Sequence, residues 1–595
     1  MSQFAFLQSE FAEVYGLARK AETLALSDPR GSCFHARLAL ESAVKWMYDN
    51  DRSLRSPYDT ALSALIHEGT FRATVGNALV TKARIIKDLG NKAVHETRPV
   101  PTQNAIICVR ELFHFSYWLV RTYARGAKPD AALAFNPDAL PRAVQVEAST
   151  LAKLQALAKE REDAAKALAE EQAARIKSEE DRAALEAENK RLKDQVAAQV
   201  AANAAIPDTH DYNEAETRDA FIDLLLSEAG WPLDQPRDRE YPVKGMPSTS
   251  GDGFADYVLW GDDGKPLAII EAKRTKRDAR VGQQQAKLYA DCMEAEFGVR
   301  PLIFYTNGYE HWLWDDERYP PRSVYGFLKK DELELWRQRK GNRRSLTTTS
   351  IDGDIVERYY QTRAIRRVGE VFEKDRQRKA LLVMATGSGK TRTVIALIDQ
   401  LMRANWCKRV LFLADRVALV KQAHSNFKKH LPSAPSANLI EKHDPKKNDH
   451  NGARVCVATY PTMMGLIDEM QNGQRKYGPG HFDLIVIDEA HRSIYRKYRA
   501  IFDYFDSLLV GLTATPRDEI DRDTYSLFEL ERGIPTDAYD LDEAVADGFL
   551  VPPTAVSVPL KFQREGIRYD DLSDECRFPL RFDPGFSSRS DPGCW

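Results

Sequence analysis

The chain has 595 residues, too many for one hydrophobic core, and its 43% hydrophobic and 29% charged content is ordinary for globular domains, so we expect a multidomain protein. The segment patterns described below make it a multidomain α/β protein. Its 85 basic and 88 acidic residues leave a net charge of −3, which excludes a globally basic nucleic-acid binder but not a local basic groove. Seven scattered cysteines argue against a disulfide scaffold or a structural zinc site. No apolar run is long enough to span a membrane, so we expect a cytoplasmic protein without a membrane partner.

Residues 1–128 are predicted to form a helical bundle, because apolar residues recur every three or four positions in four segments. The sequence LGNKAVHE, residues 89–96, resembles the signature of HEPN-like helical domains, some of which are RNases. The arginine that such RNases place shortly before the histidine is absent before His95. We therefore expect the HEPN-like fold without the RNase activity, and interpret His95 as a helix-end residue packed in the bundle.

Residues 148–204 are predicted to form a long helix, because they are rich in Ala, Glu, Lys, Arg and Gln and contain neither Gly nor Pro. One heptad frame places Leu154 and Val196 at a positions and Leu157 and Leu192 at d positions. Arginines occupy a positions in the middle of the same frame, which weakens the seam. A semi-rigid spacer and a coiled-coil dimer therefore both remain open.

Residues 208–345 are predicted to form an α/β domain, in which one helix is followed by short β-like runs. A β-hairpin would bring Asp256 beside Glu271 and Lys273, and the last two share a face because strand side chains alternate between faces. Two carboxylates and the Ala272 carbonyl make an oxygen site suited to Mg²⁺, and the lysine can orient water or neutralise a phosphate. An exposed hairpin with a Glu–Lys ion pair explains the same pattern equally well.

Two residues of the following helix favour the catalytic interpretation. Gln285 and Tyr289 are four positions apart, so their side chains project from the same face of a helix.

Residues 346–550 are predicted to form a parallel sheet covered on both faces, because short apolar runs alternate with helical segments. The sequence LLVMATGSGKTRTVI, residues 381–395, has the order strand, tight turn and helix of a phosphate-binding loop, although Met384 stands where the strict pattern has glycine. Lys390 would reach the β- and γ-phosphates and Thr391 would hold Mg²⁺. The turn itself is formed by Thr386, Gly387, Ser388 and Gly389.

Carboxylates and hydroxyls follow other predicted strands of this sheet. In DLIVIDEAHR, Asp488 can hold Mg²⁺ and Glu489 can polarise the water that attacks the γ-phosphate. In LTATP, Thr513 and Thr515 can couple the nucleotide state to a bound strand. Upstream, the amide of Gln361 can pair with adenine.

These motifs resemble those of superfamily 2 helicases and translocases, with Gln361 as the Q motif, ATGSGKT as motif I, DEAH as motif II and TATP as motif III. The resemblance implies a first RecA-like lobe in which FLADR (412–416) and ATYPTM (458–463) grip DNA. The stretch 250–290 resembles the PD-(D/E)xK nuclease of type I restriction R subunits. That resemblance assigns the nuclease core to Asp256, Glu271 and Lys273, with Gln285 and Tyr289 as an accessory element and either Glu214 or Glu216 as a further metal ligand.

A nuclease followed by an ATP-driven motor resembles the R subunit of type I restriction–modification systems over residues 208–573. The resemblance implies ATP and Mg²⁺ as cofactors, double-stranded DNA as substrate, and methyltransferase and specificity subunits as partners. The motor would reel in unmodified DNA, which the nuclease would cut. Two alternatives remain open: a defence nuclease–ATPase without methyltransferase partners, and a scaffold with both sites inactive.

Superfamily 2 motors need a second RecA-like lobe, and residues 518–595 are too few to form one. The sequence YDLDEAVADGFLVPP resembles the connection that leads into this lobe, whereas residues 551–595 end as an irregular tail rich in Pro, Gly and Ser. We expect a truncated or frame-shifted product, which binds nucleotide with feeble turnover and does not translocate.

Overall fold

The computed structural model groups the chain into two compact units, Met1–Asp540 and Leu541–Trp595. In the second unit, helix α17 (Leu541–Ala546) is the described element. No helix in the described part of the chain is both long and apolar enough to cross a bilayer. The structure describes residues 2–57, 60–95, 99–142, 152–157, 159–160, 179–206, 215–247, 251–273, 279–471, 473–490, 492–515 and 522–552.

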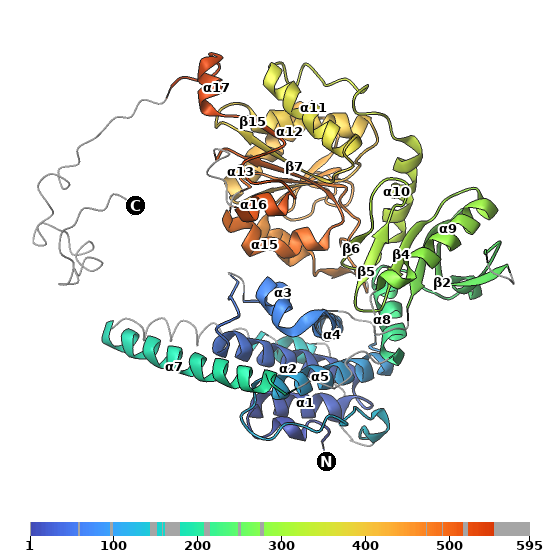
Figure 1. Cartoon of the computed structure of the whole chain (residues 1–595), viewed down its shortest axis with the longest axis vertical. Coiled ribbons are helices and arrows are strands. Elements are labelled where there is room, and N and C mark those ends of the chain that lie inside the picture. Colours follow the sequence, from blue (N-terminus) through green and yellow to red (C-terminus); the bar gives the residue numbers. More distant parts are fainter. Residues whose placement is uncertain are drawn as a thin grey trace, which may run out of the picture. The chain divides into compact units, whose positions relative to one another are not determined.

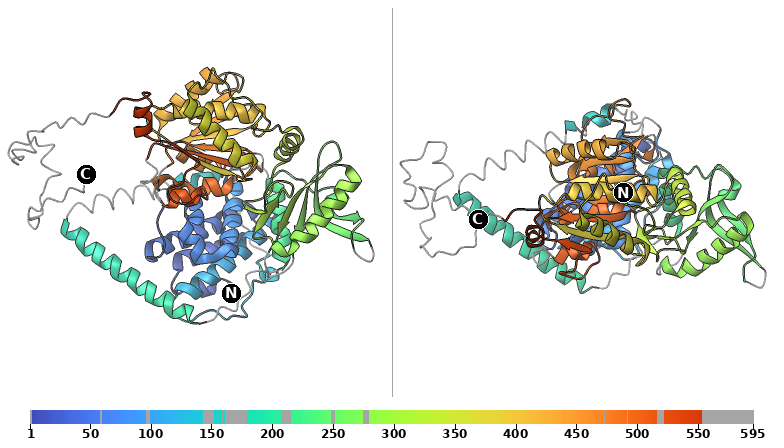
Figure 2. Two further views of the ribbon diagram at one scale, coloured as in Figure 1. Left: turned by 45° about the horizontal axis from the view of Figure 1, so that its top comes forward. Right: turned by 90° about the horizontal axis from the view of Figure 1, so that it is seen from above.

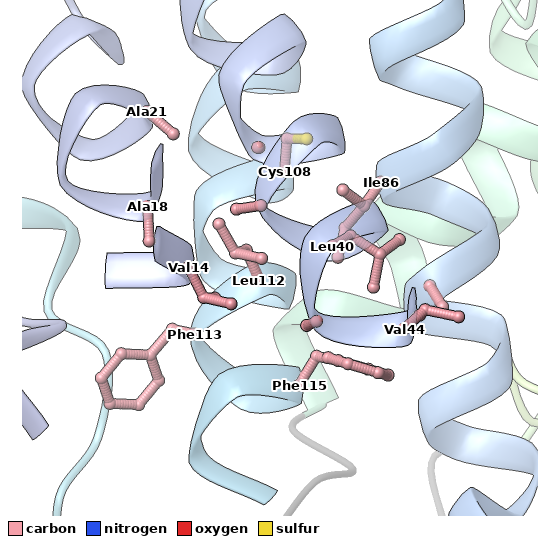
Figure 3. Close-up of a cluster of buried hydrophobic side chains, with 14 of the residues drawn as sticks. Val14, Ala18, Ala21, Leu40, Val44, Ile86, Cys108, Leu112, Phe113 and Phe115 are labelled. Carbon is pink, nitrogen blue, oxygen red and sulfur yellow. The ribbon is translucent and has the colours of Figure 1, made fainter. Parts of the chain in front are cut away.

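The N-terminal part is a helical bundle whose apolar faces meet in one core. Asp28 caps the N-terminus of the second helix, because its side chain accepts a hydrogen bond from the Gly31 N–H at 3.1 Å. Figure 3 shows buried side chains of the bundle converging, among them Val14, Leu40 and Leu112. The helices are α1 (Ala12–Leu24), α2 (Pro29–Asn50), α3 (Leu62–His67), α4 (Gly69–His95) and α5 (Thr102–Tyr123), with 3-10 turns η1 (Ala5–Leu7) and η2 (Pro137–Ala139).

Helix α4 is interrupted at Gly76, which has φ 79° and ψ 161°. A residue with a Cβ adopts that conformation only at a steric cost, so glycine permits the break. Residues 77–95 form the segment after it. His95 is the last residue of α4, as the sequence predicts. It is exposed, however, so the prediction that it packs in the bundle is wrong.

The structure describes two parts of the predicted long helix: residues 152–157 with 159–160, which are helical, and α7 (Glu179–Ala204). The side chains at the predicted a positions Leu154 and Val196 are buried in the core of the helical bundle. Those at the predicted d positions, Leu157 and Leu192, are 39% and 36% exposed. These two a positions thus pack on the chain's own bundle, whereas these two d positions lie at the surface. The side chains in the middle of the predicted seam lie outside what the structure describes.

The second part is a six-stranded mixed sheet in the order β1-β2-β3-β4-β5-β6, in which only β3 and β4 run parallel. Helix α9 packs on one face through Ala286, Tyr289 and Met293. Helices α8 and α10 bury Ile222 and Leu333 in the cluster on the other face. The elements are α8 (Ala215–Glu228), η3 (Pro236–Asp238), β1 (Arg239–Lys244), β2 (Asp252–Trp260), β3 (Pro266–Ala272), η4 (Ala279–Gly282), α9 (Gln283–Phe297), β4 (Leu302–Thr306), β5 (His311–Trp314), β6 (Arg322–Val324) and α10 (Lys330–Asn342).

The third part is a seven-stranded sheet in the order β15-β7-β14-β13-β8-β10-β9, in which every neighbouring pair is parallel. Its strands are β7 (Lys379–Met384), β8 (Val410–Ala414), β9 (Ser436–Asn438), β10 (Val455–Thr459), β13 (Leu484–Ile487), β14 (Leu508–Thr513) and β15 (Asp537–Tyr539). The predicted parallel sheet is therefore confirmed. Two of its strands, β9 and β15, were not predicted, and both are three residues long.

Helices cover both faces of this sheet: α11 and α12 lie on one side of β7, and α15 and α16 lie on the other (Figures 1 and 2). The helices are α11 (Tyr359–Glu373), α12 (Lys390–Arg403), α13 (Val417–His430), α14 (Tyr460–Leu466), α15 (Arg492–Tyr504) and α16 (Arg522–Leu527). A small unpredicted hairpin, β11 (Met470–Gln471) and β12 (Gln474–Arg475), lies between α14 and β13.

Candidate functional site

The loop between β7 and α12 has the backbone of a phosphate cradle. Gly387 and Gly389 have φ angles of 89° and 90°, which only glycine adopts without strain. The Ser388 hydroxyl donates to the Ala385 carbonyl at 2.7 Å, while Thr386 and Gly387 are exposed. The loop therefore presents its backbone at the N-terminus of α12, where a helix attracts anions.

Gln361 lies against the inner side of this loop. It is buried, and its amide Nε2 donates to the Ser388 carbonyl at 3.3 Å. The Tyr360 hydroxyl donates to the same carbonyl at 2.7 Å, and its ring stacks on Tyr539 with centroids 3.7 Å apart. In this conformation the amide that was predicted to pair with adenine holds the loop. Sequence reasoning missed Tyr360, whose only signal was its place beside Gln361.

The predicted acidic pair lies close to the cradle, because the strands β7, β14 and β13 are neighbours and their carboxyl ends share one edge. Asp488 and Glu489 directly follow β13, and the Lys390 ammonium is 3.3 Å from Glu489 Oε1. Burial, and then the charge of Glu489, raise the pKa of Asp488 to about 6. His491, which completes the DEAH sequence, lies outside the described residues.

Thr513, the last residue of β14, is fully buried and its hydroxyl oxygen accepts the Thr515 N–H at 3.1 Å. This turn places both threonines at the same edge of the sheet as the cradle and the acidic pair. Thr391 is half-buried in the first turn of α12.

The second group of predicted residues meets at the end of the β2–β3 hairpin. Tyr257 and Ile270 are paired in the antiparallel register, so Asp256 and Glu271 are the next residues on the two strands. The Asp256 carboxylate accepts the Ala272 N–H at 2.6 Å. The sequence assigned the Ala272 carbonyl to this site, whereas in the structure the Ala272 N–H makes the contact with Asp256.

A chain of hydrogen bonds continues from Glu271 to α9. The Lys273 ammonium donates to Glu271 Oε1 at 2.7 Å and to Gln285 Oε1 at 2.5 Å. The Gln285 amide in turn donates to the Tyr289 hydroxyl at 2.5 Å. Hydrogen bonds therefore join Glu271, Lys273, Gln285 and Tyr289 in one site. Asp256 is connected to the same site through its hydrogen bond to the backbone of Ala272.

The electrostatics of this site favour a cation. Glu271 is 3% exposed, and among the described residues its Oε2 has no hydrogen-bond partner. Burial, and then the charge of Asp256, raise its pKa to about 7, against the opposing effect of Lys273. A divalent ion would offset the repulsion between the carboxylates and satisfy the unpaired oxygen, so the residues fit Mg²⁺.

Two carboxylates are fewer ligands than a complete site needs. Within the described ranges, no three His, Cys, Asp or Glu side chains gather in a way that would hold a metal ion. Glu214 and the side chain of Glu216, the two candidates for a third ligand, lie outside what the structure describes.

Two family models match the chain over these sites. Residues 213–325 match the N-terminal part of the type I restriction enzyme R protein, and residues 354–518 match the res subunit of type III restriction enzymes. The first range contains the carboxylate pair, and the second contains the phosphate cradle and its acidic partners.

The chain is also similar to individual proteins. The chain is 34% identical to the EcoAI type I restriction enzyme endonuclease subunit of Escherichia coli, over 53% of this chain and 39% of that protein. It is 27% identical to the EcoKI endonuclease subunit of E. coli K12, over 95% of this chain and 56% of that protein. A fragment of an HsdR subunit from Vibrio vulnificus YJ016 matches with 27% identity and a TM-score of 0.26, over 57% of this chain and 62% of that one. The chain spans about half the length of the curated relatives it matches.

We predict that Gly389→Ala weakens nucleotide binding. The new Cβ would lie 2.6 Å from the amide nitrogen of Gln361, and the φ of 90° costs an alanine roughly 1–2 kcal/mol, so we expect a loss of at least about tenfold. A fluorescent ATP analogue titrated into the protein measures it. Gly341→Ala in α10 is the control, because its Cβ meets nothing within 4 Å. Equal affinities for both variants would contradict the geometry of the cradle.

We also predict that Glu271→Gln stabilises the metal-free protein at alkaline but not at acidic pH. The raised pKa of Glu271 means that the folded state retains a proton which the unfolded state releases above pH 4.5, so stability falls as the pH rises from 4.5 to 7. The loss is at most about 1.4 kcal/mol per pH unit, and glutamine avoids it. Denaturant unfolding in the presence of a chelator, at about pH 8 and pH 5, measures the free energy of unfolding of the variant and of wild type. A variant that is destabilised equally at both pH values would refute the raised pKa of Glu271.

Proposed function

We propose that this homologue of the type I restriction enzyme endonuclease subunits supplies the Mg²⁺-dependent endonuclease and the first, ATP-binding lobe of the motor in an ATP-dependent DNA translocase that cuts unmodified foreign DNA. Its helicase-like lobe supports the use of ATP. The observation that carries the proposal is that one chain holds two separate acidic sites, one beside a phosphate cradle and one at the end of a hairpin.

In the ATPase site, the backbone from Thr386 to Gly389 would bind the phosphates. Lys390 would neutralise the γ-phosphate, and its present contact with Glu489 would be exchanged for the phosphate when nucleotide binds. Thr391 and Asp488 would hold Mg²⁺, whose charge would also lower the raised pKa of Asp488. Glu489 would then orient and deprotonate the attacking water. Thr513 and Thr515 would relay the nucleotide state to DNA.

In the nuclease site, Asp256 and Glu271 would hold Mg²⁺, which supplies an activated water and charge stabilisation at the scissile phosphate. Lys273 would donate to the phosphate oxygens as negative charge develops on them. Gln285 and Tyr289 fix the position of the Lys273 ammonium, so they would act on the reaction through Lys273. The reaction class is phosphodiester hydrolysis.

The relatives are subunits of restriction enzymes, from which we infer double-stranded DNA as substrate and methyltransferase and specificity subunits as partners. We place the protein in the cytoplasm, where such a complex would meet incoming DNA. The nuclease fold of residues 208–345 and a spacer role of residues 148–204, as a long helix or a coiled coil, belong to the same proposal.

The nuclease assignment predicts that Asp256→Asn and Lys273→Ala each abolish Mg²⁺-dependent nicking of supercoiled plasmid. Asp262→Asn, on a carboxylate that is 86% exposed in the turn after β2, should cut like wild type. Glu489→Gln should still bind ATP and leave nicking without ATP unchanged, because its site is separate. Nicking that persists in Asp256→Asn would indicate a contaminating nuclease and favour the scaffold alternative.

A further inference from the structure

We propose that residues 77–95 of helix α4 act as a positioning element that couples the ATP site to the nuclease lysine. The inference rests on the proposed function, which assigns the two sites but gives the helical bundle no part in either. One end of this segment contacts the turn beside Lys273, and the other end joins an ion-pair cluster that includes the helicase-like lobe.

On the nuclease side, α4 contacts the turn between β4 and β5. The Thr81 hydroxyl donates to the Tyr309 carbonyl at 3.1 Å, and the Asn77 amide donates to Glu310 at 2.8 Å. The Lys82 ammonium lies 5.4 Å from the centroid of the Tyr309 ring.

The same turn is bonded to the backbone of the nuclease lysine. The Thr306 carbonyl at its start accepts the Lys273 N–H at 2.8 Å. The Thr306 hydroxyl donates to the Glu310 carbonyl at 2.8 Å, so the turn is closed on itself. A shift of α4 would therefore move the strand end that carries Lys273.

At its other end, α4 enters a cluster of buried charges that we call the joint: Lys87, Asp88, Glu228, Asp468 and Arg475. Lys87 contacts Asp468 at 2.5 Å, and Arg475 contacts Asp88 at 2.8 Å and Glu228 at 3.3 Å. Lys92 of α4 also contacts Glu228, at 3.0 Å. Three parts of the chain thus meet here: α4, the end of α8, and the hairpin β11–β12 with the residues before it.

The charges of the joint have little access to water, so each depends on its partners in the joint. The side chains of Lys87 and Glu228 are each 2% exposed, and that of Arg475 is 6% exposed. Burial favours the neutral acid, but Lys87 and then Arg475 hold the pKa of Asp88 well below its usual range. Buried charges are tolerated only while their partners stay in place, so the joint moves as a unit or breaks.

Aromatic contacts reinforce the joint. The Arg84 guanidinium of α4 lies 3.4 Å from the ring centroid of Tyr325, which follows β6. Tyr504, at the end of α15, packs on the same ring at 4.7 Å. Arg475 lies 5.4 Å from it.

The joint is one short helix away from the ATP site. The Tyr460 hydroxyl of α14 donates to the backbone carbonyl of Asp488 at 3.3 Å, and the Tyr460 ring stacks on Tyr498 of α15. Asp468 follows α14 in the sequence, and α15 follows the acidic pair. A change at Asp488 on nucleotide binding would therefore reach the joint through α14 and α15.

The test is hydrogen–deuterium exchange of the full chain with and without a non-hydrolysable ATP analogue and Mg²⁺, observed in peptides covering residues 302–314. We expect nucleotide to change their exchange rate at least about fivefold, the lower range of allosteric coupling. Thr81→Val should remove that response, because valine keeps the shape but not the donor. Thr74→Val is the matched control: its hydroxyl bonds to the Thr70 carbonyl within α4 and should leave the response intact.

Asp88→Asn is a second variant, which breaks the joint on the other side and should also remove the response. Each variant is compared at saturating nucleotide, with affinity measured separately. Wild-type protein that binds nucleotide without any response at residues 302–314 would overturn the coupling and leave the proposed ATPase site intact. A full response in Thr81→Val would also overturn it. A chain that binds no nucleotide would instead overturn the ATPase assignment, and the coupling with it.

Discussion

The buried carboxylate of Glu271 lies beside the half-buried carboxylate of Asp256, and the nuclease interpretation depends on this arrangement. Burial, and then the neighbouring charge of Asp256, raise the pKa of Glu271 to about 7, so the ionised pair is costly without a cation. The hairpin register and the Ala272 N–H fix Asp256, while Lys273 fixes one oxygen of Glu271. Folding therefore maintains an arrangement that a bound cation would make favourable.

The ATP site depends on a different constraint, the order of strands in a parallel sheet. The phosphate cradle, the acidic pair and the TAT segment are more than a hundred residues apart at the extremes, yet they follow three neighbouring strands. Because all seven strands are parallel, their carboxyl ends share one edge. The two sites are built differently. The cradle is formed by backbone, whereas the proposed nuclease site is a chain of side-chain hydrogen bonds that small shifts of β3 or β4 would disturb.

The local elements of both sites could be predicted from the sequence because they have strong local signals. Buried strands such as LLVM and LIVI, and the glycines of the cradle, identify themselves by composition, and the D…ExK spacing identifies a hairpin. The edge strand β15 could not be predicted, because three residues carry no periodicity and its place is set by pairing with β7. The role of Gln361 against Ser388 depends on how α11 packs over the loop, which spacing does not determine. The heptad frame of α7 was ambiguous because it does not say what the apolar positions pack against. Val196 packs on the chain's own bundle, and no local sequence pattern distinguishes this packing from packing on a partner helix.

The central claim is that Asp256 and Glu271 share one metal ion independently of nucleotide. The most direct measurement is equilibrium binding of Mn²⁺, a spectroscopic substitute for Mg²⁺, to the nucleotide-free chain near neutral pH. The account predicts a site in wild-type protein that is lost in Asp256→Asn and retained in Asp488→Asn. Retention of that site in Asp256→Asn, or its loss in Asp488→Asn, would contradict the account.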